Sequence, residues 1–198
     1  KRNGKNAVIP THRKNAIFAN FKGVPRAPGR MGENTVIVVL RNAWFWLIPV
    51  TGDLMSVGLV VDRDHFLKSG LSTEEMLHET IAKTPWMRNR MSEAERVTQV
   101  YARKDFSYLM KNVAGENFAL VGDAAGFLDP IFSTGVYLAM MSADMAADAI
   151  EARLRQGSLR GLRRYEKSIT AALARYHRFI DNFYRREFLE VFLQPSDR

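Results

Sequence analysis

The stretch that most constrains the fold begins at Phe118 and reads FALVGDAAGFLDPIFSTGVYLAMMSADMAADAIEARL. Its first four residues are a continuous apolar run, which predicts a short strand buried on both faces of a layered α/β sheet. From Gly135 onward the sequence predicts a helix with a low-profile side that packs closely against a sheet. That side would consist of four alanines: Ala139, Ala143, Ala146 and Ala147.

Two residues at the end of the predicted strand could meet a ligand. In layered α/β sheets, ligands bind beyond the carboxyl ends of the strands, where Gly122 and Asp123 lie. A glycine lets a ligand approach the backbone, and a carboxylate accepts hydrogen bonds from hydroxyl groups such as those of a ribityl or ribose chain. An ordinary Gly-Asp turn without a ligand is the alternative.

The start of the predicted helix favours negative charge. Ser133 or Thr134 would be the N-cap, and the first backbone N–H groups of the helix would face the loop with a partial positive charge. A halide ion or the pyrimidine edge of a reduced, anionic flavin could bind there. Pro130 would stiffen the loop, because its ring restricts φ. A capped helix start without a ligand is the alternative.

The first half of the sequence predicts an antiparallel meander. One face of its second aromatic run would carry Trp44, Trp46 and Ile48, because side chains alternate along a strand. The other face is apolar as well, which predicts a core strand. Four runs rich in β-branched and aromatic residues are expected to be strands: 15–22, 35–40, 43–50 and 54–61.

Helices are expected later in the chain. Ser72 opens a capping box, and Pro85 would end the helix that follows it. A short helix near 86–95 and a strand with its loop within 97–113 come next. From Leu162 an apolar residue recurs every three or four positions, which predicts an amphipathic helix with an Arg-rich opposite face. Its other apolar positions are Tyr165, Ile169, Leu173, Tyr176, Ile180 and Phe183.

Composition excludes several classes of protein. A length of 198 residues with 46% hydrophobic residues suffices for one domain, or for one domain with an extension. The absence of Cys excludes disulfides, thiolate nucleophiles and cysteine-ligated metal sites. The apolar runs are shorter than the roughly 18 residues that cross a bilayer, so we expect a soluble, cytoplasmic protein with no membrane span. Asp62, Asp64 and His65 are expected to end a strand and start a loop rather than to bind a metal ion.

The net charge of +8 is unevenly distributed, because both ends of the chain are basic and the middle is acidic. No zinc-finger spacing, basic region before a leucine repeat or aromatic RNA-binding signature accompanies this charge, so nucleic-acid binding is not expected. A basic surface for an acidic partner, or a solvated face, is expected instead. One arginine cluster could dock an acidic carrier protein or could be a solvated helix end: Arg153, Arg155, Arg160, Arg163 and Arg164.

Three segments together resemble the FAD-dependent halogenases. GDAAG, at 122–126, looks like the second flavin-binding motif of flavoprotein monooxygenases and geranylgeranyl-reductase-like enzymes. WFWLIP, at 44–49, fits the halogenase signature WxWxIP, and DFSY at 105–108 looks like the segment before the flavin motif. The resemblance runs from about residue 15 to about residue 193. The pattern FxxPxxSxG is met by Phe127, Pro130, Ser133 and Gly135.

This resemblance implies a fold of the α+β or α/β class, as part of a two-domain flavoprotein monooxygenase. Residues 1–115 would form the antiparallel substrate-domain sheet with inserted helices. Residues 116–157 would supply the strand and long helix that close the FAD domain, and 158–198 an amphipathic C-terminal helical segment. The implied reaction is halogenation, most simply chlorination, of an electron-rich aromatic ring through a flavin hydroperoxide and hypohalous acid.

The resemblance also implies site residues. Asp123 would meet the ribityl or phosphate chain of FAD, and Pro130 would lie near its ring. Trp44, Trp46 and Ile48 would line the substrate side and keep the substrate away from the flavin. The full set for FAD is Gly122, Asp123, Ala124, Gly126, Pro130 and Gly135, and the set for chloride or bromide is Ser133, Thr134 and Gly135.

Two features of the family are not found in this sequence. The glycine-rich fingerprint GxGxxG is absent, and the catalytic lysine of the family precedes the matching region, so no lysine here inherits that role. We therefore expect the C-terminal portion of a longer enzyme, which by itself binds FAD weakly or not at all. Its expected partners are the missing N-terminal portion, a flavin reductase that supplies reduced FAD, and an aromatic small molecule, free or tethered to a carrier protein.

Two alternatives to halogenation stay open at this point. One is an FAD-dependent monooxygenase or reductase of the same fold. The other is a truncated, non-catalytic binding module that uses its basic ends on an acidic partner. Halide-dependent product mass separates halogenation from the first alternative, and flavin absorbance after the N-terminal portion is supplied separates it from the second.

Overall fold

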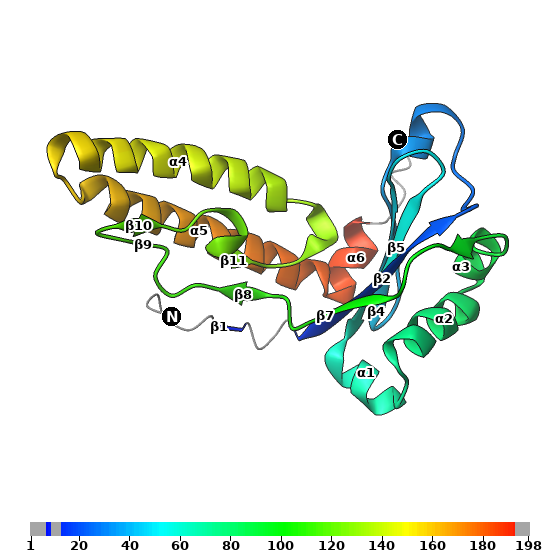
Figure 1. The fold of residues 1–198 in the computed structure, drawn as a ribbon. Helices are drawn as coiled ribbons and strands as arrows, with labels where there is room; N and C mark the ends of the chain where they lie inside the picture. Colours follow the sequence, from blue (N-terminus) through cyan, green and yellow to red (C-terminus); the bar gives the residue numbers. More distant parts are fainter. Residues whose placement is uncertain (1–6, 9–12, 193–198) are drawn as a thin grey trace. The chain divides into compact units, whose positions relative to one another are not determined.

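The computed structural model describes residues 7–8 and 13–192, and the chain divides into two compact units. One unit consists of Lys1–Ile9 with Ser107–Arg198, and the other of Pro10–Phe106 (Figure 1). Residues 1–6 and 9–12 of the predicted segment 1–115, and 193–198 of the predicted segment 158–198, lie outside the described residues.

The Pro10–Phe106 unit is built on an antiparallel sheet. The strands within 36–62 form the predicted meander, and the strand at Lys14–Lys22 pairs with the last of them. Its strand order is β3-β4-β5-β2-β6, and β7 also pairs with β2. Every pairing between its described strands is antiparallel, and Trp46 of β4 lies opposite Gly58 of β5. The strands are β2 (Lys14–Lys22), β3 (Val36–Val39), β4 (Ala43–Pro49), β5 (Met55–Asp62), β6 (Glu95–Arg96) and β7 (Tyr101–Lys104).

Short helices cover one face of this sheet. They are α1 (Arg63–Ser69), α2 (Thr73–Lys83) and α3 (Pro85–Arg90), and a 3-10 turn, η2 (Gly29–Glu33), precedes β3 (Figure 1). The core joins sheet residues such as Phe45, Leu47 and Leu59 to Leu77 and Met87 of the helices. The sheet and its helices therefore share one continuous apolar core.

The predicted capping box is confirmed at α2. The Ser72 hydroxyl accepts a hydrogen bond from Glu75 N–H at 3.2 Å, and the Glu75 carboxylate accepts one from Ser72 N–H at 2.8 Å. Hydrogen bonds from the side chain and from the backbone of Ser72 to the Glu75 carboxyl lower its pKa. The loop predicted after Asp62 is wrong, because α1 begins directly at Arg63. Asp64 in its first turn favours that helix start, since acidic groups stabilise N-terminal turns.

The second unit is organised around two long helices that lie side by side, α4 (Gly135–Gln156) and α5 (Arg160–Phe183) (Figure 1). The predicted amphipathic helix is confirmed in α5, whose buried residues include Leu162, Tyr165 and Ile169. The remaining elements are β1 (Ala7–Val8), β8 (Tyr108–Leu109), β9 (Ala114–Gly115), β10 (Phe118–Ala119), η3 (Gly122–Ala124), β11 (Gly126–Phe127), η4 (Pro130–Phe132) and α6 (Arg186–Phe192).

The strand predicted to be buried on both faces is wrong in two respects. Only Phe118–Ala119 is a strand; both residues are half-buried, and Val121 is 37% exposed. Among the described residues, β10 pairs only with β9, antiparallel. A strand buried on both faces needs a layer packed on each side of it, and the half-buried Phe118 and Ala119 are not covered in this way.

The prediction of which side of α4 is packed is also wrong, because the buried side is rotated about the helix axis from the predicted one. Ala143 and Ala147 are exposed, whereas the buried positions are Ser142, Ala146 and Ala149. This side faces α5 rather than a sheet: a Cβ at Gly161 of α5 would lie 3.1 Å from the Cα of Ala149. Two helices approach this closely only where both present small residues. None of the described helices is long and apolar enough to cross a membrane.

The sheet core gives a stability prediction. Leu59 is fully buried in β5, whereas Leu67 of α1 is 61% exposed. We expect Leu59→Ala to lower the free energy of unfolding by about 2–5 kcal/mol, because the truncation removes buried apolar surface and leaves a cavity. Leu67→Ala should change it by less than about 0.5 kcal/mol. Urea denaturation of both variants measures the difference, and equal midpoints would contradict this description of the core.

Candidate functional site

The glycine turn that follows β10 is clamped to α4. Gly122 has φ +53°, a left-handed conformation that favours glycine. Its N–H donates a hydrogen bond to Ser142 Oγ at 2.8 Å, and Ser142 Oγ donates to Ala139 O at 3.0 Å. A Cβ at Gly122 would lie 3.0 Å from the Cβ of Ala139. The turn therefore needs glycine both for its φ and for this close packing.

Asp123 presents a free carboxylate at the tip of this turn. The residue is exposed, and within 7–8 and 13–192 its carboxylate has no hydrogen-bond or ion-pair partner. Its backbone oxygen accepts a hydrogen bond from the Tyr108 hydroxyl at 2.6 Å. Burial raises the pKa of Tyr108, and the negative charge of Asp123 raises it further. The backbone of Asp123 is thus held in place while its side chain can accept hydrogen bonds from hydroxyl groups.

Gly126 has a structural role that the sequence did not reveal. A Cβ there would lie 2.9 Å from Leu109 Cδ2 and 3.0 Å from the backbone oxygen of Tyr108. The glycine thus lets β11 pair with β8, with Gly126 opposite Leu109. Ala124, the other small residue predicted to bind the cofactor, is exposed.

The loop around Pro130 is anchored by a buried aspartate. Asp129 is 5% exposed, and its carboxylate accepts hydrogen bonds from Ile131 N–H at 3.0 Å and from the Tyr184 hydroxyl at 2.8 Å. Phe132 packs against Phe179 of α5, with ring centroids 4.6 Å apart. The loop leading into α4 is therefore fixed to the end of α5.

The start of α4 is open. Thr134 occupies the predicted N-cap position but makes no side-chain capping bond, and a Cβ at Gly135 would meet nothing within 4 Å. Ser133, the other predicted N-cap, has a left-handed φ of +51° and is exposed. Gly122 packs against Ala139, which lies one helical turn, about 6 Å, from Gly135. The glycine turn and the uncapped helix start therefore occupy the same end of α4.

The predicted tryptophan face lies in the other unit, on β4. The Trp46 indole N–H donates to Ser56 Oγ at 3.2 Å, and its ring centroid lies 5.9 Å from that of Trp44. A Cβ at Gly58 would lie 2.1 Å from the Trp46 ring, so glycine is required beneath the indole. Trp44 is 2% exposed and Ile48 is 38% exposed. Trp44 and Trp46 thus form one packed pair.

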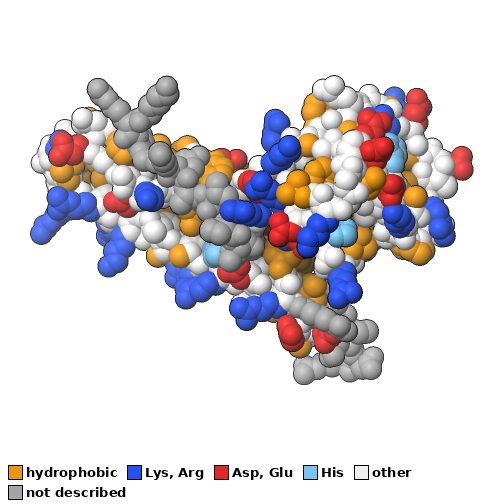
Figure 2. All heavy atoms as spheres, turned by 90° about the horizontal axis from the view of Figure 1, so that it is seen from below, with side chains coloured by type: hydrophobic (Ala, Val, Ile, Leu, Met, Phe, Trp, Pro, Cys, Tyr) orange, Lys and Arg blue, Asp and Glu red, His pale blue; other side chains and the backbone are white. Residues whose placement is uncertain are grey.

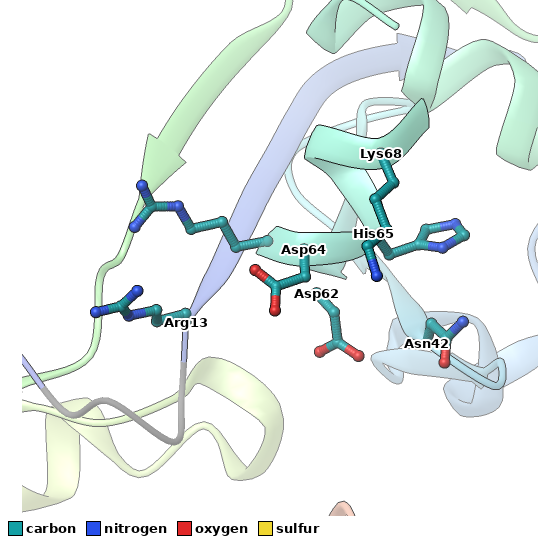
Figure 3. Close-up of a pocket in the computed structure, with 7 residues that line it drawn as sticks. Arg13, Asn42, Asp62, Asp64, His65 and Lys68 are labelled. Atoms are coloured by element: carbon teal, nitrogen blue, oxygen red, sulfur yellow. The ribbon is translucent and has the colours of Figure 1, made fainter. Parts of the chain in front are cut away.

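Asp62, Asp64 and His65, which the sequence analysis considered together, line a pocket of about 450 Å³ (Figure 3). The Asp62 carboxylate pairs with Lys14, and Arg63 pairs with Asp105 at 2.7 Å. The His65 ring points away from the carboxylates of Asp62 and Asp64 (Figure 3). The described residues contain no group of three or more His, Cys, Asp or Glu side chains that could hold a metal ion.

Several supporting residues were not found from the sequence. Asp129 precedes a proline, a turn signal that could have identified it. Ser142 gave no such signal, and Tyr165 was expected only as an apolar position of the helix, because the hydrogen-bond partners of both are distant in sequence. The Tyr165 hydroxyl donates to Leu120 O at 2.5 Å. Burial raises the pKa of Tyr165, and a hydrogen bond with Ser142 offsets part of that increase.

A matched pair of glycine variants tests the geometry of the Gly122 turn and of the start of α4. We expect Gly122→Ala to destabilise the protein by about 1–2 kcal/mol, because alanine is strained at positive φ and its methyl group would crowd Ala139. Gly135→Ala should leave stability unchanged or raise it by up to about 1 kcal/mol, because the position is helical and open. Urea denaturation compares the two, and equal destabilisation would contradict the described geometry.

A second variant tests the packing of the tryptophan pair. Gly58→Ala should displace the Trp46 ring, since the new methyl group and the indole cannot occupy the same space. The near-UV circular dichroism of the Trp44–Trp46 pair should then change. Trp86, which is 45% exposed on α3, is replaced by Phe in both proteins to remove its signal. An unchanged spectrum would show that the ring does not lie over Gly58.

Comparison with known proteins gives a consistent result. The profile of the tryptophan halogenase family matches residues 7–188. A 1H-pyrrole-2-carbonyl-[peptidyl-carrier protein] chlorinase of Pseudomonas fluorescens is 36% identical over 177 residues, which cover 87% of this chain and 39% of that protein. A 1H-pyrrole-2-carbonyl-[peptidyl-carrier protein] brominase of Pseudoalteromonas luteoviolacea is 35% identical over 150 residues, which cover 75% of this chain and 37% of that protein.

Solved structures agree with this match. The myxobacterial chondrochloren halogenase CndH superposes with a TM-score of 0.82 at 31% identity, over 90% of this chain and 42% of that one. The flavin-dependent brominase Bmp2 superposes with a TM-score of 0.89 at 27% identity, over 98% of this chain and 50% of that one. The chain thus spans about two fifths of the curated relatives. On this evidence, the chain belongs to the tryptophan halogenase family.

Proposed function

We propose that this chain is part of an FAD-dependent halogenase that transfers chloride or bromide, as an electrophilic halogen, to an electron-rich aromatic ring. The observation that carries this proposal is the open start of α4 beside the Gly122 turn. Backbone N–H groups without a side-chain cap favour an anion, and a free carboxylate next to them favours a ligand with hydroxyl groups. A halide and a flavin together match both preferences.

The residues of the Gly122 turn and of the start of α4 fit the cofactor. Asp123 would accept hydrogen bonds from the ribityl chain, while Gly122 and Ala124 let the cofactor approach the backbone of η3. Pro130 and Gly135 would lie along the ring, because no side chain fills the space at Gly135. When bound, reduced FAD with dioxygen would supply the oxidising power that makes halide electrophilic. This chain would position the cofactor.

The halide would bind at Ser133, Thr134 and Gly135. The left-handed turn at Ser133 ends η4 and leads directly into the helix start. The first N–H groups of the 22-residue helix α4 carry the partial positive charge that attracts an anion. The Asp129 anchor keeps this turn fixed, so that the donors do not have to reorganise when the anion binds.

Trp44, Trp46 and Ile48 would form the substrate side of the site. The indoles are locked by packing and by the hydrogen bond to Ser56, which suits a rigid wall better than a mobile lid. In this proposal, residues 1–115 mainly serve the substrate, 116–157 the cofactor, and 158–198 support both. The catalytic lysine and the adenosine site would come from the remaining part of the full-length protein.

The partners follow from the same proposal. A flavin reductase would supply reduced FAD. The substrate would be a pyrrole-like ring on a carrier protein, because the two relatives described above are by name enzymes of pyrrolyl-carrier substrates. The decisive experiment supplies full-length enzyme with reduced FAD, oxygen and 1H-pyrrole-2-carbonyl carrier protein, with chloride or bromide. A product with the isotope pattern of the added halogen is expected, and halide-independent oxygen insertion would overturn the proposal.

A point variant tests the halide position. In the full-length enzyme, Gly135→Ala should raise the KM for halide about fivefold, because the methyl group enters the open space where the anion approaches the backbone. Val136→Ala is the control, since Val136 is 73% exposed and the change leaves the backbone unaltered. Halide titration of turnover measures both. An unchanged KM in Gly135→Ala would place the halide elsewhere.

A further inference from the structure

The exposed charged side chains of α5 are all cations. Its exposed charged residues from the first turn onward recur at helical spacing, so they share one side of the helix. The opposite side is buried, from Leu162 to Phe183. In the space-filling view, Lys and Arg side chains follow one another along the lower left of the molecule (Figure 2). We call these six exposed residues the cationic stripe: Arg160, Arg163, Arg164, Lys167, Arg175 and Arg178.

No acidic residue neutralises this stripe from within α5. Glu166 is turned inward and accepts hydrogen bonds from the N–H groups of Val113 and Ala114, at 3.1 and 3.4 Å. Asp181 lies 3.3 Å from the His177 ring. Within the part of the chain that the structure describes, no stripe side chain forms an ion pair. The stripe therefore keeps its full positive potential.

Several exposed cations of other helices differ in this respect. Arg155 of α4 pairs with Glu151 at 2.7 Å, and Lys83 of α2 pairs with Glu79. Arg153 donates to the backbone oxygen of Gly157 at the end of α4. The arginine cluster seen in the sequence thus separates into two engaged residues on α4 and three free ones on α5.

The stripe has the dimensions of a helix-binding surface. From Arg160 to Arg178 it extends over about 27 Å. The stripe has two groups of cations, one within 160–167 and one within 175–178. The exposed residues between the groups are small: Thr170, Ala171 and Ala174. A partner helix can approach the backbone there while its acidic side chains reach the cations on either side.

We propose that the cationic stripe is the docking surface for an acidic carrier protein that delivers the tethered aromatic ring. This inference rests on the proposed function, because a carrier protein is needed only if the enzyme halogenates a tethered ring. A membrane surface is disfavoured, since interfacial helices insert an apolar face and that face of α5 is buried. A nucleic acid is disfavoured because base stacking needs free rings among the cations, whereas Tyr165 is buried, Tyr176 is half-buried and the Phe179 ring packs against Phe132.

The test uses the full-length enzyme and a fluorescently labelled 1H-pyrrole-2-carbonyl carrier protein. Arg164→Glu/Arg175→Glu reverses one charge in each group of the stripe. We expect its Kd for the carrier, measured by anisotropy, to rise roughly tenfold or more at low salt, because charge reversal replaces attraction by repulsion at two contacts. The difference should shrink at about 0.5 M salt, where charges are screened over a few ångströms.

A matched control carries the same change in net charge. Arg41→Glu/Arg88→Glu alters two exposed arginines of the other unit that form no ion pair within the described residues. Its Kd for the carrier should equal that of wild type. Turnover of a free pyrrole substrate by all three proteins shows that the reversed enzymes are folded and competent, and FAD absorbance gives a second check that does not depend on turnover.

The outcomes separate this inference from the proposed function. Carrier affinity lost only in the stripe variant supports docking, even if no halogenated product forms. Equal carrier affinity in the stripe and control variants overturns docking, and does so even if the enzyme halogenates its substrate. A stripe variant that loses binding to anionic vesicles or RNA, but keeps carrier affinity, also overturns it.

Discussion

The hydrogen bond from Gly122 N–H to Ser142 Oγ is the interaction on which the candidate site depends. It ties the turn after β10 to the second turn of α4, across 20 residues of chain. Ser142 is buried, so the bond is shielded from water, and loss of the hydroxyl would leave the Gly122 N–H without this acceptor. The orientation of Asp123 relative to the helix start follows from this clamp.

A second constraint is the way α5 divides its charges. Its two acids face inward or toward neighbouring groups on the helix, where Glu166 binds backbone N–H groups and Asp181 lies beside His177. Its cations face outward. The same helix thereby supports β9, anchors the Pro130 loop through Phe179 and Tyr184 at its end, and presents a one-signed surface. Support of the site and presentation of a docking surface are therefore properties of one amphipathic element.

Sequence reasoning succeeded where the signal is local. The capping box at Ser72, the apolar spacing of α5 and the alternating face of Trp44 and Trp46 all depend on residues within one or two turns or strands, and the structure confirms them. It failed for the strand at Phe118, because burial of a strand depends on neighbours that a local window does not contain. It also misassigned the packed side of α4, because several alanines compete and only the partner helix decides which of them are buried.

The sequence by itself determined the strands of the antiparallel sheet, the long helices, the glycine turn, the position of the α4 start and the family to which the chain belongs, because these rest on residue types at short, fixed spacing. Only the tertiary structure decided what holds them together. The pairing of Asp129 with Tyr184, of Gly122 with Ser142 and of Tyr165 with Leu120 joins residues 55, 20 and 45 positions apart. Such pairs follow from how the long helices pack, and no local pattern of residues encodes that packing.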